Sequence, residues 1–325
     1  FRADHFTPEH TPFLYSLGQK GINFTKAYSP GPFTSAAFIS LLGGVPPLKY
    51  GYYAPLPEEV NLVSEKLQEK GFKTFAIHSN AYLSSFFGYN RGWDVFEDFL
   101  TQERKSSLCR RCMKTSEKVL KSILSKQQYE KFFDFMSRHI PVELLPQNKA
   151  YENAQTINLT FQRNIKNLRD NNFFWIHYMD AHTPYAPPKE YLRNLKLSTS
   201  IARLNLLTHK DPTNITKKEL EDLKKLYARS LGYIDDQIKS LFLMIPEKER
   251  QDSVFIITSD HGEEFKEHGG ITHFAKFYEE NIHVPLIIYG NKIPCQVIED
   301  IMSTQSTPDM IEAIASSDRL DYKKF

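Results

Sequence analysis

The chain has 325 residues, of which 41% are hydrophobic and 25% are charged, and its formal net charge is +2. These values are ordinary for a globular protein and give no basis for predicting a nucleic-acid partner. The sequence contains no run of 18 apolar residues, so we expect no transmembrane helix within it. No signal peptide is visible either.

Helices and short apolar strands alternate along most of the chain. In chain order we expect a helix at 7–20, a strand at 22–29, helices at 34–43 and 57–71, a strand at 72–79, a helix at 149–169, a strand at 171–180, a helix at 217–244, strands at 252–262 and 283–290, and a helix at 307–317. Strands that are apolar throughout are typical of parallel sheets covered on both faces. The sequence therefore predicts an α/β fold with a mainly parallel central sheet and helices on both faces.

Residues 101–150 differ from this pattern, because they are polar, helical in character and rich in lysine and phenylalanine. We interpret them as a basic helical insertion in a single domain that spans residues 1–325. Positive charge is concentrated at 104–126, which offers an alternative function, the binding of an anionic glycan by a non-catalytic protein.

The stretch "SPGPFTSAAFISLLGG" combines a hydroxyl pair with the start of a helix. One interpretation is a core helix with Thr34 or Ser35 as its N-cap and Gly43-Gly44 as its end. The other is a hydroxyl at a helix N-terminus, where backbone N–H groups and the helix dipole favour an anion.

Two predicted strands end in Asp and His. "TSDHG" places Asp260 and His261 after one strand, and "HYMDAHTPY" places Asp180 and His182 after another. Carboxylate and imidazole together suit zinc or manganese, with calcium as an alternative that prefers oxygen ligands. Two such strand ends together with a helix-terminal hydroxyl predict a metal-assisted site that cleaves esters.

The ordered blocks "FRADHF", "TSAAFISLLGGVPP", "HYMDAHTPY" and "SDHGEEFKEHG" resemble the sulfatase branch of the alkaline-phosphatase superfamily over nearly the whole chain. The resemblance implies a metal-dependent enzyme that hydrolyses or transfers sulfuric or phosphoric esters. In the family the nucleophile stands ten residues before the glycine that closes the first active-site helix. Counting back from Gly44 gives Thr34.

A threonine at this position departs from the sulfatases, which carry Cys or Ser in the pattern Cys/Ser-x-Pro-x-Arg and convert it to formylglycine. It resembles instead the phosphoethanolamine and phosphoglycerol transferases of the superfamily, in which a metal-bound threonine attacks phosphorus. A transferase that modifies a cell-envelope glycan or lipid is therefore the alternative to a hydrolase.

The resemblance assigns the remaining site residues. Asp260 and His261, with Thr34, match metal ligands, and His273 matches a basic residue that contacts the ester oxygens. His182 matches a substrate contact, and we add His268 and Asn80 as substrate contacts. Asn80 stands near the place where sulfatases carry Gly-Lys-x-His, and that Lys and His are absent here.

The family's first strand ends in a metal-binding Asp shortly before the block that begins at Phe1. We therefore expect a further Asp upstream of Phe1, a first strand missing from this chain, truncation at the N-terminus and also at the C-terminus, and poor metal binding and activity by the chain as given. The expected substrate is a sulfated or phosphorylated glycan, lipid or small-molecule ester. The full-length protein is expected outside the cytoplasm or at a membrane, and no feature sets its oligomeric state.

Overall fold

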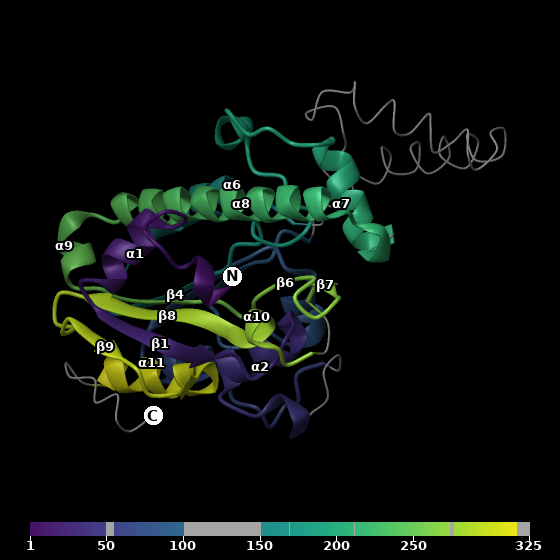
Figure 1. The fold of residues 1–325 in the computed structure, drawn as a ribbon. Helices are drawn as coiled ribbons and strands as arrows, with labels where there is room; N and C mark the ends of the chain where they lie inside the picture. The colour runs from purple at the N-terminus through teal and green to yellow at the C-terminus, as the bar shows by residue number, and fades with distance from the viewer. Residues whose placement is uncertain (50–54, 101–150, 169, 211, 274–275, 317–325) are drawn as a thin grey trace.

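The computed structural model describes residues 1–49, 55–100, 151–168, 170–210, 212–273 and 276–316 (Figure 1). The predicted insertion at 101–150 lies outside these residues, and so do the cysteines at 109 and 112. Among the described helices, none is long and apolar enough to cross a membrane.

The larger sheet is mixed and is built around β1 (Ile22–Tyr28) and β8 (His283–Gly290), which run antiparallel to each other. β5 (Val254–Thr258) pairs antiparallel with β8. On the other side of β1, β9 (Gln296–Ile298) and β10 (Met302–Ser303) pair with it in parallel. β1 and β8 therefore form the centre of this sheet, and their inward side chains are almost completely buried.

The smaller sheet is parallel throughout. Its order is β3 (Val95–Glu97), β2 (Lys73–Ile77) and β4 (Asn172–Ile176). The expectation of one mainly parallel sheet thus holds for this half of the molecule and not for the pairs around β8. The physical reason is the link from β5 to β8. Its described residues form two short antiparallel strands, β6 (Glu264–Phe265) and β7 (Ile271–Thr272), and the four-residue helix α10 (Glu279–Ile282). None of these is a crossover helix long enough to return the chain in parallel.

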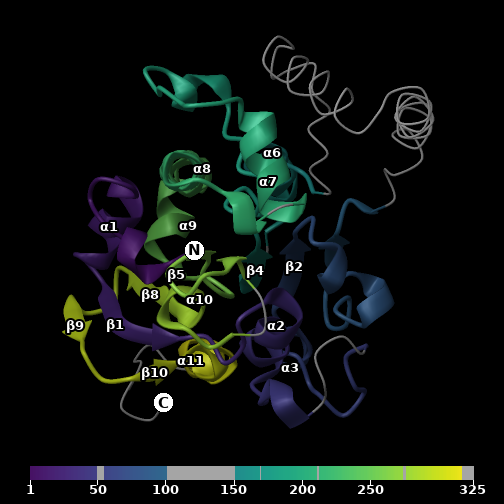
Figure 2. The same cartoon turned by 45° about the vertical axis from the view of Figure 1, so that its right-hand side comes forward.

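Helices cover both sides of the sheets, as predicted. The 28-residue helix α8 (Lys217–Met244) lies on one side with α1 (Pro12–Gly18), α6 (Ala154–Asn164), α7 (Ile201–Lys210) and α9 (Glu247–Gln251). On the opposite side lie α2 (Thr34–Gly43), α3 (Val63–Glu69) and α11 (Thr307–Ser316), as both Figure 1 and Figure 2 show. The core is formed where these layers meet the apolar strands.

β4 and β5 differ from the other long strands in their exposure. Every residue of β4 is only partly buried, and so is most of β5, whereas four of the five residues of β2 are fully buried. In the described part of the chain β4 pairs only with β2, and β5 pairs only with β8. Phe255 of β5 and Ile176 of β4 nevertheless pack against the same apolar cluster. The edges of β4 and β5 therefore lie near one another in the middle of the fold.

Candidate active site

Thr34 is the first helical residue of α2, not its cap. Phe33 has the extended backbone of the N-cap residue, and no side chain caps the helix. The expectation of a Thr34 or Ser35 N-cap is therefore wrong. The Thr34 hydroxyl instead donates a hydrogen bond to Asp260 Oδ2 at 3.1 Å, across 226 residues of sequence. Gly44, with φ of 68°, ends the helix in the left-handed region that glycine favours.

Asp260 and His261 follow β5 directly and lie within the same site. The distance from His261 Nε2 to Asp260 Oδ2 is 3.4 Å. His261 Nδ1 donates to the carbonyl of Gly262 at 2.8 Å, so the lone pair is left on Nε2. Burial lowers the pKa of His261 to about 3, which keeps this imidazole neutral. Burial works to raise the pKa of Asp260, but the adjacent histidines outweigh it and hold that pKa below its usual range.

This donor set fits a divalent metal ion in part. A neutral imidazole whose Nδ1–H is held by a backbone carbonyl is the usual state of a histidine ligand, and a carboxylate beside it suits zinc or manganese. The Thr34 hydroxyl supplies an oxygen next to the Asp260 carboxylate. Within the described residues, however, no cluster of three or more His, Cys, Asp or Glu side chains could hold a metal ion. Asp260 and His261 thus fit as two ligands that need at least one more acidic or imidazole partner.

His273 lies beside His261, with 4.0 Å between the ring centroids. Its Nδ1 is 3.1 Å from Oε1 of Glu263, a carboxylate that is 3% exposed. Burial alone would lower the pKa of His273, but the charge and hydrogen bond of Glu263 outweigh it and raise the pKa above its ordinary value. His273 is thereby suited to carry a proton in the site.

The end of β4 contributes His182 and His177 but not Asp180. The His182 ring is 5.0 Å from the His273 ring, and burial, followed by the charge of His273, lowers its pKa. His177 is partly buried and lies close enough to Asp260 for the charges of the two to influence each other. Asp180 accepts a hydrogen bond from the backbone N–H of Ala154 at the start of α6, so its carboxylate serves that helix N-terminus.

The other two expected substrate contacts are engaged in local hydrogen bonds. Asn80 Oδ1 accepts from the backbone N–H of Tyr82, and its Nδ2 lies 3.3 Å from the sulfur of Met179. The ring of His268 stacks on Tyr278 at 3.7 Å and is hydrogen-bonded to Glu280. Their substrate roles remain predictions, and the structure brings neither of them into direct contact with Thr34, Asp260 or His273 in the contacts it displays.

Sequence reasoning missed Glu263 and gave His177 no role in the site. Glu263 stands two residues after His261, so its position in the motif "DHGE" was visible. Its pairing with His273 and with Tyr185, 78 residues away, could be seen only in three dimensions.

Comparisons with known proteins show the family and the fold. The family profile named Sulfatase matches residues 1–316. A curated arylsulfatase of Clostridium perfringens is 24% identical over an alignment of 359 residues. The alignment covers 96% of this chain and 74% of that protein.

Solved structures share the fold. The phosphonate monoester hydrolase of Agrobacterium radiobacter superposes with a TM-score of 0.68 at 16% identity, covering 94% of this chain and 69% of that one. Lipooligosaccharide phosphoethanolamine transferase A of Neisseria meningitidis, an integral membrane protein, has a TM-score of 0.63 and 16% sequence identity. That match covers 96% of this chain and 52% of the other. The C-terminal periplasmic domain of EcEptC from Escherichia coli, in complex with zinc, has a TM-score of 0.61 and 13% sequence identity. That match covers 94% of this chain and 75% of the other.

These similarities extend over nearly the whole chain, and the family profile alone covers all but its last nine residues. The fold is that of the alkaline-phosphatase superfamily. The chain belongs to the sulfatase family, as a hydrolase or transferase of that family.

Proposed function

We propose that this chain carries the catalytic centre of a metal-dependent enzyme that cleaves phosphate esters with Thr34 as its nucleophile. The observation that supports this most strongly is the Thr34 hydroxyl, which is not used to cap its own helix and lies 3.1 Å from Asp260 Oδ2.

Asp260, His261 and Thr34 would hold the metal ion, with zinc or manganese favoured by the imidazole and carboxylate donors. When bound, such an ion lowers the pKa of a coordinated hydroxyl and offsets the negative charge of the ester oxygens. The residues themselves provide the orientation. Asp260 fixes the Thr34 oxygen at the N-terminus of α2, where the backbone N–H groups face an incoming anion.

The proposed chemistry has two steps. In the first, the Thr34 hydroxyl loses its proton to solvent, a bond forms between its oxygen and phosphorus, and the bond from phosphorus to the leaving oxygen breaks. The leaving oxygen takes a proton from His273. In the second, the oxygen of water or of an acceptor alcohol attacks phosphorus, its proton goes to His273, and the bond from phosphorus to the Thr34 oxygen breaks. The released Thr34 oxygen takes back a proton from solvent.

Phosphate esters are proposed as better substrates than sulfate esters. Position 34 holds Thr where sulfatases carry the Cys or Ser that is converted to formylglycine, and positions 36 and 38 hold Ala and Phe in place of the accompanying Pro and Arg. An unmodified threonine suits a phosphoryl or substituted phosphoryl transfer. The similarity to phosphonate monoester hydrolase and to a phosphoethanolamine transferase supports the same substrate class.

We further propose that the missing metal ligand is an Asp that precedes Phe1 in the natural protein. The main-chain nitrogen of Phe1 is 2.6 Å from the carbonyl oxygen of His261 and 2.7 Å from Ser259 Oγ. A residue attached to that nitrogen would therefore enter beside the metal ligands. A strand leading to it would fit between the partly exposed edges of β4 and β5.

The substrate is proposed to be a phosphorylated or sulfated glycan, lipid or small-molecule ester met outside the cytoplasm. This follows from the similarity to a periplasmic domain and to a lipooligosaccharide transferase.

The proposal is tested with the full-length protein, reconstituted with zinc or manganese, on matched 4-nitrophenyl phosphodiester, phosphonate monoester and sulfate substrates. We expect the phosphorus esters to be turned over faster, and Thr34→Ala to lose that turnover. Sulfate hydrolysis without any phosphoester cleavage would show that the curated arylsulfatase is the better guide to the reaction.

A further inference from the structure

Glu263 is a buried carboxylate with two different hydrogen-bond partners. Its Oε1 faces His273 Nδ1 at 3.1 Å, and its Oε2 accepts a 2.7 Å hydrogen bond from the hydroxyl of Tyr185. Glu263 is 3% exposed and Tyr185 is fully buried. A buried carboxylate is costly unless hydrogen bonds and charge compensate it, and here the compensation comes from an imidazole and a phenol.

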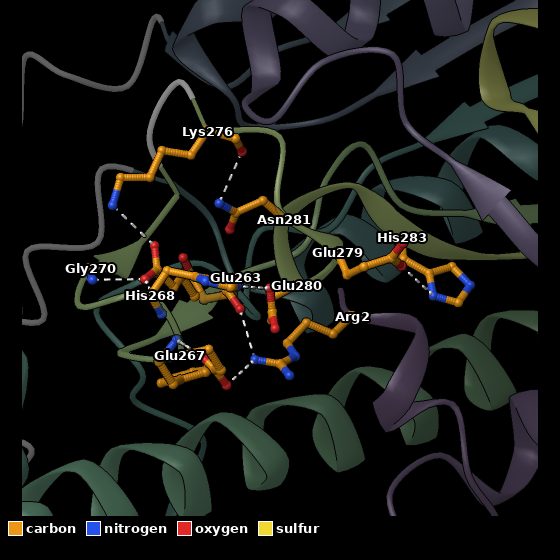
Figure 3. A network of polar contacts seen from close by, with 12 residues as sticks. Arg2, Glu263, Glu267, His268, Gly270, Lys276, Glu279, Glu280, Asn281 and His283 are labelled. Atoms are coloured by element: carbon orange, nitrogen blue, oxygen red, sulfur yellow. Dashed lines mark hydrogen bonds and ion pairs between the residues drawn. The ribbon is translucent and has the colours of Figure 1, made fainter.

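The main chain of Glu263 is held as firmly as its side chain (Figure 3). Its N–H donates to the carbonyl of Glu280 at 2.7 Å, and its own carbonyl accepts from Arg2 Nη1 at 3.1 Å. Gly262, immediately before it, packs so closely on Glu280 that a Cβ there would come within 2.0 Å of the carbonyl oxygen. The carboxylate is thus fixed from both ends.

Tyr185 is fixed in the same manner. Its backbone N–H and carbonyl are both hydrogen-bonded to the side chain of Asn205, at 2.7 and 2.9 Å. Its ring packs edge-on against Tyr227, with centroids 5.5 Å apart. These contacts hold the Tyr185 ring in the orientation in which its hydroxyl donates to Glu263.

We propose that Glu263, supported by Tyr185, is the positioning residue of His273, which it holds with Nδ1–H on the carboxylate and Nε2 left for the substrate. The inference rests on the proposed function for the identity of the reaction. A carboxylate can only accept, so the Glu263 contact requires the hydrogen of His273 on Nδ1. Nε2 is then the nitrogen that can reach an ester oxygen.

This arrangement restricts the His273 ring to one orientation and one tautomer. A surface-type histidine samples several ring orientations and both tautomers, whereas a proton donor must present one nitrogen within hydrogen-bond reach of the leaving oxygen. Outer partners of this kind typically change activity by about 10–100-fold when they are removed. Glu263 has no need to contact the substrate to produce that effect.

The first test needs no turnover. Full-length protein labelled with ¹⁵N in its histidines is studied at a pH at which the imidazoles are neutral, and His273 is assigned by comparison with His273→Ala. We expect the Nδ1–H tautomer in the wild type and a shift toward Nε2–H, the form preferred by free imidazole, in Glu263→Ala. A wild-type ring in the Nε2–H form, or one unchanged by Glu263→Ala, overturns the proposal.

The second test uses leaving groups. In Glu263→Gln, kcat should fall about 10–100-fold for an alkyl phosphodiester, whose leaving oxygen needs a proton, and much less for the 4-nitrophenyl ester, while KM stays close to the wild-type value. Tyr185→Phe should give the same pattern with a smaller loss. Tyr227→Phe removes a neighbouring buried hydroxyl that does not bond to Glu263 and is the control. Equal losses for both esters, or a Tyr227→Phe loss as large as that of Tyr185→Phe, would contradict a positioning role.

The two proposals can fail separately. If Thr34 proves not to be the nucleophile, the tautomer of His273 still reports whether Glu263 orients it. If Thr34 is the nucleophile and the tautomer does not respond to Glu263→Ala, only the positioning role is wrong.

Discussion

The ends of β4 and β5 look alike in sequence and differ in the partners that their aspartates meet. Each strand delivers an Asp followed closely by a His, yet Asp260 meets the Thr34 hydroxyl while Asp180 accepts from the backbone N–H of Ala154. The difference comes from what each carboxylate faces when the strand ends. α6 begins directly opposite the end of β4, so its unsatisfied N–H groups engage Asp180. An acidic residue after a strand is therefore a candidate ligand only if no helix N-terminus competes for it.

His182, after β4, and His273, after β7 (Ile271–Thr272), have pKa values shifted in opposite directions. The rings of His182 and His273 are 5.0 Å apart, and burial lowers the pKa of His182 while Glu263 raises that of His273. Environments that separate two neighbouring pKa values in this manner divide acid from base roles. Within this pair, His273 is the residue suited to donate a proton.

The largest expected effect separates the two aspartates. Asp260→Asn should abolish turnover and release zinc or manganese on dialysis, because it removes a charged ligand and the partner of Thr34. Asp180→Asn should keep the metal and most of the activity. Metal content by plasma emission spectroscopy, measured beside kcat, checks both. Metal loss from Asp180→Asn with retention in Asp260→Asn would reverse the comparison.

The next effect concerns the histidine pair. His273→Ala should lower kcat by roughly 10²–10⁴-fold, the range for a positioned acid or base, with unchanged metal content. His182→Ala should act mainly on KM, because a neutral ring contacts the substrate without supplying the proton. Steady-state kinetics on one phosphodiester distinguish the two. A His273→Ala protein that loses its metal would identify His273 as a ligand instead.

A third strand end, that of β2, gives a smaller effect on stability. Burial lowers the pKa of His78 to about 3. Below pH 6.5 His78 is therefore protonated in the unfolded chain but stays neutral in the folded chain until the pH approaches 3. Stability from this group is complete above pH 6.5 and falls by roughly 1.4 kcal/mol for each pH unit as the pH drops toward 3. Urea unfolding at pH 7 and pH 5 should therefore show a loss about 2 kcal/mol larger in the wild type than in His78→Asn. Equal pH dependence in the two proteins would show that His78 is not kept neutral by the fold.

The smallest expected effect belongs to the helix that Asp180 serves. Asp180→Ala should lower the free energy of unfolding by about 1–2 kcal/mol, as the loss of a helix N-terminal acceptor does, without changing the metal content. Thermal and urea unfolding measure it. No change in stability would mean that the Ala154 N–H finds another acceptor.

Regular elements could be predicted from the sequence wherever local signals were complete. The predicted helix 217–244 has the bounds that the structure gives it, and the structure shows a capping box of Thr216 and Glu219 at its start. The direction of β8 and the true cap of α2 were not predicted. The first follows from the short link between β5 and β8, which the apolar strand pattern does not reveal, and the second goes with the contact between Thr34 and Asp260 across 226 residues. Thr34, Asp260, His261 and His273 are assigned from the family resemblance and their roles stay predictions, whereas the contact of Glu263 with His273 is visible only in the structure.

The most direct test of the central claim is the mass of the protein during turnover. Full-length enzyme is mixed with a phosphodiester, quenched in acid and digested, and the peptide that contains residues 33–44 is analysed by mass spectrometry. Thr34 as nucleophile predicts a phosphoryl or substituted phosphoryl group on Thr34 in the wild type, none in Thr34→Ala, and full labelling in the matched control Ser35→Ala. An active enzyme with no modified peptide, or with the group on Ser35, would contradict the account.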